Sequence, residues 1–143
     1  MPTTKKLRFL LLLSGLLATA IGAGLLFAPI AFHAQNGIQL RADASLLSEL
    51  RAPGGALLLA GATMLAGALV RRFAATAAAV GAAVFSSYGV ARLVGVGLDG
   101  VPNQGIVVAT VLELGLGALF AVALLRGKRQ AATRVATNVE LAR

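Results

Sequence analysis

The chain has 143 residues, of which 58% are hydrophobic, and 13 Lys and Arg against 5 Asp and Glu give it a formal net charge of +8. That apolar share is too high for a soluble core of this length, and at about 20 apolar residues per crossing the chain has room for four transmembrane helices. The charge does not indicate nucleic acid, because there is no Trp, only one Tyr, and the basic residues cluster at the ends of apolar runs. The absence of cysteine and the single histidine exclude disulfides, iron–sulfur clusters and multi-histidine metal sites, so no metal and no cofactor is expected.

The first apolar run, residues 9–32, carries no charge. It follows three basic residues, Lys5, Lys6 and Arg8. This pattern predicts a transmembrane helix that starts in the cytoplasm. A cleaved signal peptide is the alternative, since residues 18–20 (Ala-Thr-Ala) offer a small-x-small pattern, but the run exceeds the roughly 7–15 apolar residues typical of such a peptide.

The connection over residues 33–51 begins with an Asn36-Gly37 turn signal, and Asp43 can then cap a short helix. The apolar residues after the cap share one face: Leu46, Leu47 and Leu50. We therefore expect a short interfacial helix between the first and second transmembrane helices. A functional lid is the alternative to simple interfacial packing.

The second charge-free run is residues 52–70, with Pro53 in its expected first turn, where a missing N–H costs little. A tight hairpin through two arginines leads to the third run, residues 73–91. The fourth run covers about residues 105–125 and contains one charge, Glu113. The fold class that follows is all-α, an integral membrane bundle of four transmembrane helices with up-down topology.

Domain limits and orientation follow from the basic residues. Residues 1–126 form the predicted transmembrane domain and residues 127–143 a basic cytoplasmic tail. Ten Lys and Arg lie at the N-terminus, in the 71–72 turn and in the tail, against three on the opposite side: Arg41, Arg51 and Arg92. This bias predicts a multi-pass protein of the inner (plasma) membrane with both termini cytoplasmic.

Two rows of small residues recur at four-residue spacing: Ala20, Gly24 and Ala28, and then Ala75, Ala79 and Ala83. Such rows allow helices to approach closely in lipid. Packing within the bundle is favoured over a dimer contact.

Glu113 lies about two turns inside the fourth helix, where a charge costs at least about 2.5 kcal/mol unless it is paired or hydrated. Tyr88 and Arg92 are four residues apart on one face of the third helix, and an arginine can bind a carboxylate. Depth alone predicts one polar cluster in the outer half of the bundle: Glu49, Arg51, Tyr88, Arg92, Asp99 and Glu113. The cluster is either structural or a site that binds a polar head group or moves an ion, and no catalytic residue is assigned. His33 is interpreted as interfacial.

Several short patterns extend over nearly the whole chain: Phe27-Ala28-Pro29, residues 48–52 (Ser-Glu-Leu-Arg-Ala) with Gly54-Gly55, Tyr88-Gly89-x-x-Arg92, Asp99-Gly100-x-Pro102, and Glu113. Together they resemble the uncharacterised bacterial family called domain of unknown function 4345. The resemblance implies a compact four-helix membrane protein and no particular activity. A looser similarity to DoxX-type membrane proteins, some of which are linked to quinone-dependent oxidation, concerns architecture alone.

Three functions remain open at this point. The first is a non-enzymatic accessory, assembly or ligand-binding bundle, whose partners are membrane lipid, another membrane protein or a second copy of the chain. The second is a proton- or ion-coupled carrier that uses Glu113, for which a dimer is expected. The third is a component of a quinone-linked oxidoreductase.

Overall fold

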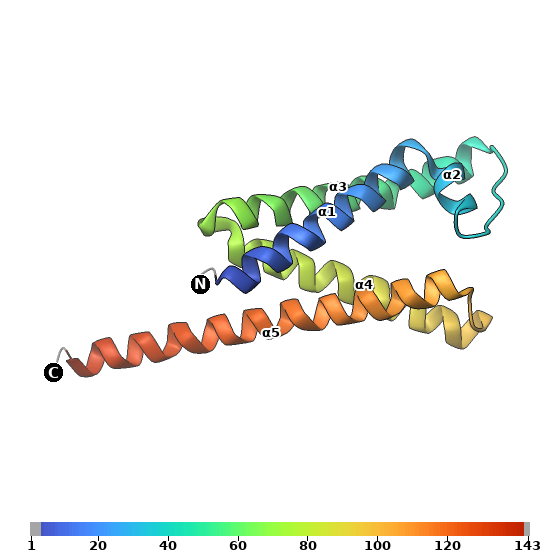
Figure 1. Ribbon diagram of the computed structural model, residues 1–143. Helices are drawn as coiled ribbons and strands as arrows, with labels where there is room; N and C mark the ends of the chain where they lie inside the picture. Colours follow the sequence, from blue (N-terminus) through green and yellow to red (C-terminus); the bar gives the residue numbers. More distant parts are fainter. Residues whose placement is uncertain (1–3, 142–143) are drawn as a thin grey trace.

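The computed structural model describes residues 4–141, and the regular structure in that range is helical (Figure 1). The four long helices are α1 (Lys5–Phe27), α3 (Ala44–Leu69), α4 (Ala74–Asp99) and α5 (Gln104–Leu141). A short helix, α2 (Pro29–Ala34), follows α1, and the 3₁₀ turn η1 (Arg71–Phe73) precedes α4. Four helical spans are long and apolar enough to cross a membrane. The chain is therefore an all-α protein of membrane type.

The first helix is shorter than expected, because it breaks at Ala28 instead of continuing through Phe32. Ala28 has φ −137° and ψ 52°, and Pro29 starts α2 as its first residue. A proline disfavours helical geometry in the residue before it, which accounts for the break. The side chain of Phe32 then packs back onto α1, where a Cβ on Gly24 would lie 2.6 Å from the Phe32 ring.

The expected separate helix over residues 43–51 is absent, because these residues form the first turns of α3. Asp43 caps that helix, its Oδ1 accepting a hydrogen bond of 2.9 Å from the Leu46 N–H. Pro53 therefore lies inside α3 and not in its first turn. A proline has no N–H, so the carbonyl of the residue four positions earlier, here Glu49, loses its helical hydrogen bond. Glu49 is exposed, so water or lipid head groups can bind that carbonyl instead.

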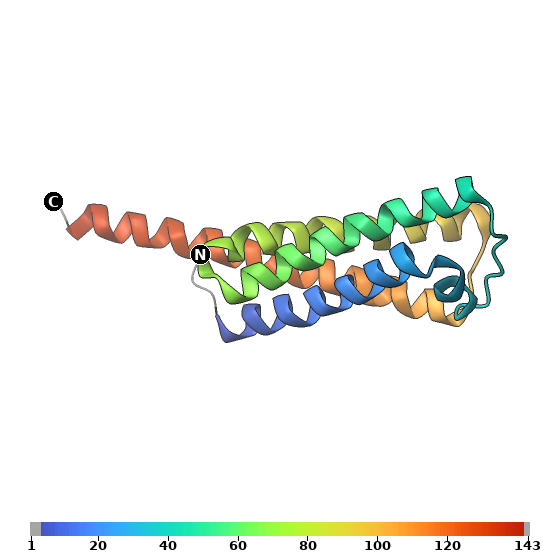
Figure 2. The ribbon, with the colours of Figure 1, turned by 90° about the horizontal axis from the view of Figure 1, so that it is seen from above.

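α4 and α5 both extend beyond the apolar runs expected from the sequence, residues 73–91 and about 105–125. α4 continues through Arg92 to Asp99 and stops at Gly100, whose φ of 93° is the left-handed conformation that ends many helices. Asn103 caps α5, because its Oδ1 accepts a hydrogen bond of 3.1 Å from the Ile106 N–H. α5 then runs without a break across the expected domain limit at residues 126–127, and its last turns extend beyond the other helices (Figure 2).

The bundle consists of two tightly packed pairs, α1 with α3 and α4 with α5, which are joined mainly by packing of α3 against α4. Glycines mediate the first pair: a Cβ on Gly22 would lie 2.8 Å from the Gly54 carbonyl oxygen, and one on Gly61 2.9 Å from that of Gly15. Because residue 15 meets residue 61 and residue 22 meets residue 54, the two helices are antiparallel.

The expected packing through the two alanine-containing rows is wrong. Most of their members are exposed: Ala20, Ala28, Ala75, Ala79 and Ala83. Glycine allows backbones to approach more closely than alanine does, so the contact between α1 and α3 forms along their glycines. A four-residue spacing identifies one face of a helix but not which face turns inward.

The second pair packs around Phe120, which is fully buried. Its ring stacks on Phe85 with 6.2 Å between centroids and covers Gly81, where a Cβ would lie 2.6 Å from the ring. Further along, a Cβ on Gly89 would contact Leu114. These contacts make α4 and α5 antiparallel as well.

Candidate functional site

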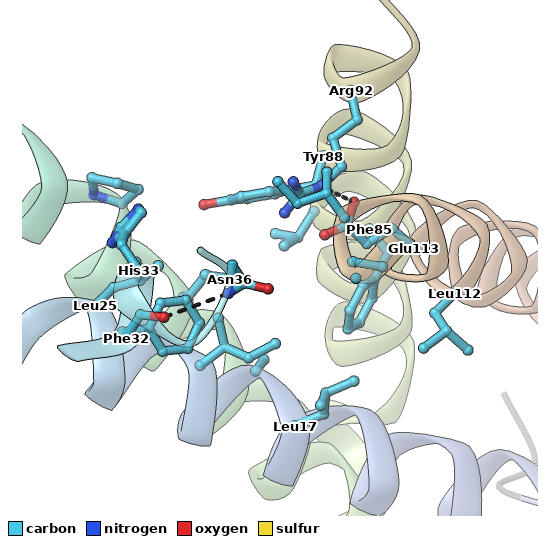
Figure 3. A pocket seen from close by; sticks show the side chains of 18 of the residues that line it. Leu17, Leu25, Phe32, His33, Asn36, Phe85, Tyr88, Arg92, Leu112 and Glu113 are labelled. Atoms are coloured by element: carbon cyan, nitrogen blue, oxygen red, sulfur yellow. Dashed lines mark hydrogen bonds and ion pairs between the residues drawn. The ribbon is translucent and has the colours of Figure 1, made fainter. Parts of the chain in front are cut away.

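A cavity of about 410 Å³ lies between the two helix pairs, near the end of the bundle that holds α2 and the turn before α5 (Figure 3). Its wall is mostly apolar. All four long helices contribute to it, each with residues from the half that lies nearer α2. The apolar lining includes Leu17, Ile21, Leu25, Leu57, Phe85, Ile106, Leu112 and Leu116.

Helical spacing explains why these side chains share one cavity. Residues 17, 21 and 25 repeat every fourth position along α1, and residues 85, 88 and 92 do nearly the same along α4. On α5 the lining positions 106, 109, 113 and 116 follow the same spacing, with 105 and 112 beside them. Side chains three or four residues apart project from one face of a helix, so each helix presents one stripe to the cavity.

The polar end of the cavity is formed by an ion pair between α4 and α5. Arg92 Nε donates a hydrogen bond of 2.8 Å to Glu113 Oε2 (Figure 3). The two side chains are 33% and 15% exposed, respectively. A charge-assisted bond of this kind is stronger than a bond between neutral groups. It satisfies one oxygen of the Glu113 carboxylate inside the otherwise uncharged part of α5, residues 105–125.

Tyr88 lies one turn before Arg92 and lines the same cavity. Its ring packs against the core of the bundle, and its hydroxyl points across the cavity in the direction of His33 (Figure 3). The tyrosine therefore places a group that can both donate and accept a hydrogen bond between the ion pair and the α2 side of the cavity.

His33 and Asn36 line the wall on the α2 side (Figure 3). His33 Nδ1 lies 2.9 Å from the Pro29 carbonyl oxygen. Because that oxygen can only accept, Nδ1 carries the hydrogen, and Nε2 is the acceptor of the neutral ring. Neither residue was expected from the sequence to belong to the site. The signal for them is Pro29, which breaks the first helix and folds α2 back over the bundle.

The three remaining members of the expected cluster do not line the cavity. Glu49 and Asp99 are exposed, and Arg51 donates from Nε to the Leu26 carbonyl oxygen at 3.1 Å. The break at Ala28 deprives the end of α1 of its next helical N–H groups, so Arg51 serves as a cap there. The structure thus brings together Tyr88, Arg92 and Glu113 out of the six residues that depth alone had grouped.

A hydrogen bond joins two turns beside the cavity. Asn103 Nδ2 donates to the Asn36 carbonyl oxygen at 2.8 Å and so joins the turn after α2 to the turn before α5. Gly105 lies beside this bridge, where a Cβ would lie 3.3 Å from both asparagine Oδ1 atoms. The same Asn103 side chain therefore caps a helix and links the two halves of the bundle.

Within the described residues, no group of three or more His, Cys, Asp or Glu side chains is placed to hold a metal ion. The polar end instead offers hydrogen-bond donors and acceptors from Arg92, Glu113 and Tyr88. Such an arrangement can orient the polar head of a mostly apolar molecule.

Comparison with known proteins places this site in a family without an assigned activity. The family model described as a domain of unknown function, DUF4345, matches residues 6–124, a range that contains every residue of the cavity. No curated protein and no solved structure matched the chain.

Proposed function

This chain belongs to the DUF4345 family, a domain of unknown function, and we propose from its site that it is a non-enzymatic membrane protein that binds a small, lipid-soluble ligand inside the bundle. The observation that carries the proposal is the cavity of about 410 Å³, with an apolar wall and polar side chains gathered at one end. Small-molecule sites typically have volumes of about 300–1,000 Å³ and combine apolar walls with a few orienting polar groups.

The lining supports binding more than catalysis. It contains no serine, threonine or cysteine to act as a nucleophile, and the carboxylate of Glu113 is engaged by Arg92. Its polar groups are placed to hydrogen-bond a ligand head. An accessory or assembly role agrees with this proposal if the ligand is a membrane lipid.

We place the protein in a bacterial inner membrane with both termini in the cytoplasm and up-down topology. The ten basic residues at the N-terminus, the 71–72 turn and the tail support this orientation. The antiparallel succession of helices, which leaves both ends of the chain at one end of the bundle, agrees with it (Figure 1). The cavity then lies in the outer half of the membrane, and the end of α5 projects into the cytoplasm.

The chain contains an intrinsic probe for this proposal, because Tyr88 is its single tyrosine and there is no tryptophan. The protein in phosphatidylcholine vesicles is titrated with single-chain amphiphiles that carry bromine, which quenches tyrosine fluorescence on contact. We expect saturable quenching in the parent protein. Ala109→Phe, which fills the cavity, should abolish the saturable part, and Ala118→Phe, on the exposed face of the same helix, should retain it. Equal quenching in all three proteins would refute a ligand in the cavity.

The carrier remains the second candidate because Glu113 lies in the cavity wall. If Glu113→Gln leaves every flux into vesicles and its pH dependence unaltered, the carrier is excluded. The quinone-linked component is excluded if the purified protein holds no quinone and transfers no electrons to quinone analogues.

A further inference from the structure

We propose that the ligand is a single-chain amphiphile whose uncharged head both donates and accepts hydrogen bonds, such as a hydroxyl or a primary amide, held at Arg92 and Glu113. This inference rests on the proposed ligand-binding function and names the class of ligand for the same cavity. Three observations carry it: the charge balance of the lining, its hydrogen-bonding capacity and its volume.

The charges of the cavity wall cancel. Arg92 and Glu113 are the two residues of the lining that are charged at pH 7 with His33 neutral, and their side chains are bound to each other at 2.8 Å. A head with a net charge would therefore find no free counter-charge in a mostly apolar cavity. Burial of an unpaired charge is strongly unfavourable, so the wall selects against anionic and cationic heads alike.

The ion pair keeps donors and acceptors available for a neutral head. A guanidinium has five N–H groups, and among the described residues Arg92 uses its Nε for Glu113 Oε2 alone. The terminal amino groups of Arg92 remain donors, and Oε1 of Glu113 remains an acceptor. Tyr88 adds a hydroxyl that can do both. A head that can both donate and accept is complementary to this side-by-side arrangement, whereas one that only accepts leaves Glu113 Oε1 without a donor.

The volume and shape of the apolar part favour one chain. About 410 Å³ lies toward the lower end of the range for small-molecule sites, which favours a ligand with one chain over a phospholipid with two. Leu17 and Leu25 on α1 and Leu112 and Leu116 on α5 all line the cavity, and α1 and α5 are not among the extensively packed helix pairs. The chain of the ligand would occupy the space that these two helices leave between them.

The head class is tested with brominated probes that share one chain length: a monoacylglycerol, a fatty amide, an alkyl sulfate and an alkyl trimethylammonium. Quenching of Tyr88 in phosphatidylcholine vesicles is measured for each, with Ala109→Phe as the background. We expect the two uncharged probes to bind at least about tenfold more tightly than either charged probe. A diacylglycerol, with the same kind of head and two chains, should bind more weakly than the monoacylglycerol.

Single substitutions in the ion pair should then change the preference in opposite directions. Glu113→Gln leaves a positive charge in the wall and should favour the sulfate, whereas Arg92→Gln leaves a negative charge and should favour the trimethylammonium. The double variant restores neutrality and should favour neither. The reversed pair Arg92→Glu/Glu113→Arg also keeps the charges balanced, so it should retain the preference for uncharged heads if the single variants do not assemble.

The outcomes separate the two proposals. If no probe quenches Tyr88 beyond the Ala109→Phe background, the proposed ligand-binding function is wrong. If the probes bind saturably but the parent protein prefers a charged head, or does not discriminate among heads, the cavity binds ligands and the inference about the head is overturned. An unchanged preference in both folded single variants would equally overturn it.

Discussion

Arg92 on α4 and Glu113 on α5 form an ion pair with 2.8 Å between Nε and Oε2. The pair joins two antiparallel helices at the depth of the cavity, so it links that helix pair and also forms the polar end of the site. Both roles follow from one contact, and they are separable by experiment.

The first prediction concerns the stability that this pair provides. Arg92→Ala and Glu113→Ala should each lower the free energy of unfolding by about 1–2 kcal/mol, the magnitude found for polar contacts between membrane helices. The double variant should cost no more than either single change, because each single change already removes the contact. Thermal unfolding in mild detergent measures this, and Arg129→Ala, an exposed residue of α5, serves as the control with an effect below about 1 kcal/mol. Additive losses would show that the two residues are not coupled.

Close packing of α1 on α3 yields the second prediction. Gly54→Ala should destabilise the protein by about 1–3 kcal/mol, because its Cβ would lie 2.7 Å from the Leu26 backbone nitrogen. The neighbouring Gly55 has nothing within 4 Å of an added Cβ. Gly55→Ala should therefore be neutral or stabilising by up to about 1 kcal/mol, as expected for helix propensity. Circular dichroism melting compares the two, and similar melting temperatures would contradict the packing of α1 against α3.

A third prediction uses the two roles of Asn103. Asn103→Asp keeps an oxygen that can cap α5 but removes the donor to the Asn36 carbonyl, whereas Asn103→Ala removes both. Asn103→Asp should therefore leave the start of α5 intact and speed amide hydrogen exchange in residues 33–43. Asn103→Ala should speed exchange in both regions. If amide exchange in Asn103→Asp matches that of the parent protein throughout, the bridge to the Asn36 carbonyl does not hold the turn after α2 in place.

The fourth prediction concerns Arg51, which caps α1 and does not join the site. Arg51→Met should cost about 1 kcal/mol of stability, the usual contribution of one hydrogen bond, and should leave the Tyr88 quenching assay unchanged. Arg41→Met provides the matched control, since Arg41 is also exposed. A loss of ligand binding in Arg51→Met with full stability would return this residue to the functional site.

The fifth prediction is the orientation of the chain. A reporter that is active only in the cytoplasm should be active when it is fused to the C-terminus, because ten of the thirteen Lys and Arg lie on that side in the proposed topology. The same reporter placed in the loop at residue 39, between α2 and α3, should be inactive, because this loop lies on the opposite side of the membrane in the proposed topology. Periplasmic activity of the C-terminal fusion would overturn the orientation.

Composition and charge pattern alone determine that this chain forms four long apolar helices of membrane type. The reason is that lipid offers no hydrogen-bond partners to the backbone, so an apolar stretch of sufficient length has helix as its one stable state there. The helix cap at Asp43 and the turn at Asn36-Gly37 could also be predicted from the sequence, because each depends only on residues that are neighbours in the chain.

The tertiary structure decided which residues meet. Hydropathy assigns a depth to Glu49, Arg51, Tyr88, Arg92, Asp99 and Glu113, but not the direction in which each side chain faces around its helix. That direction depends on which stripe packs inward, and here the glycines of α1 and α3 and the ring of Phe120 determine it. The break at Pro29 had a similar effect, since it folded His33 and Asn36 over the bundle and made them part of a cavity that spacing along the chain does not reveal.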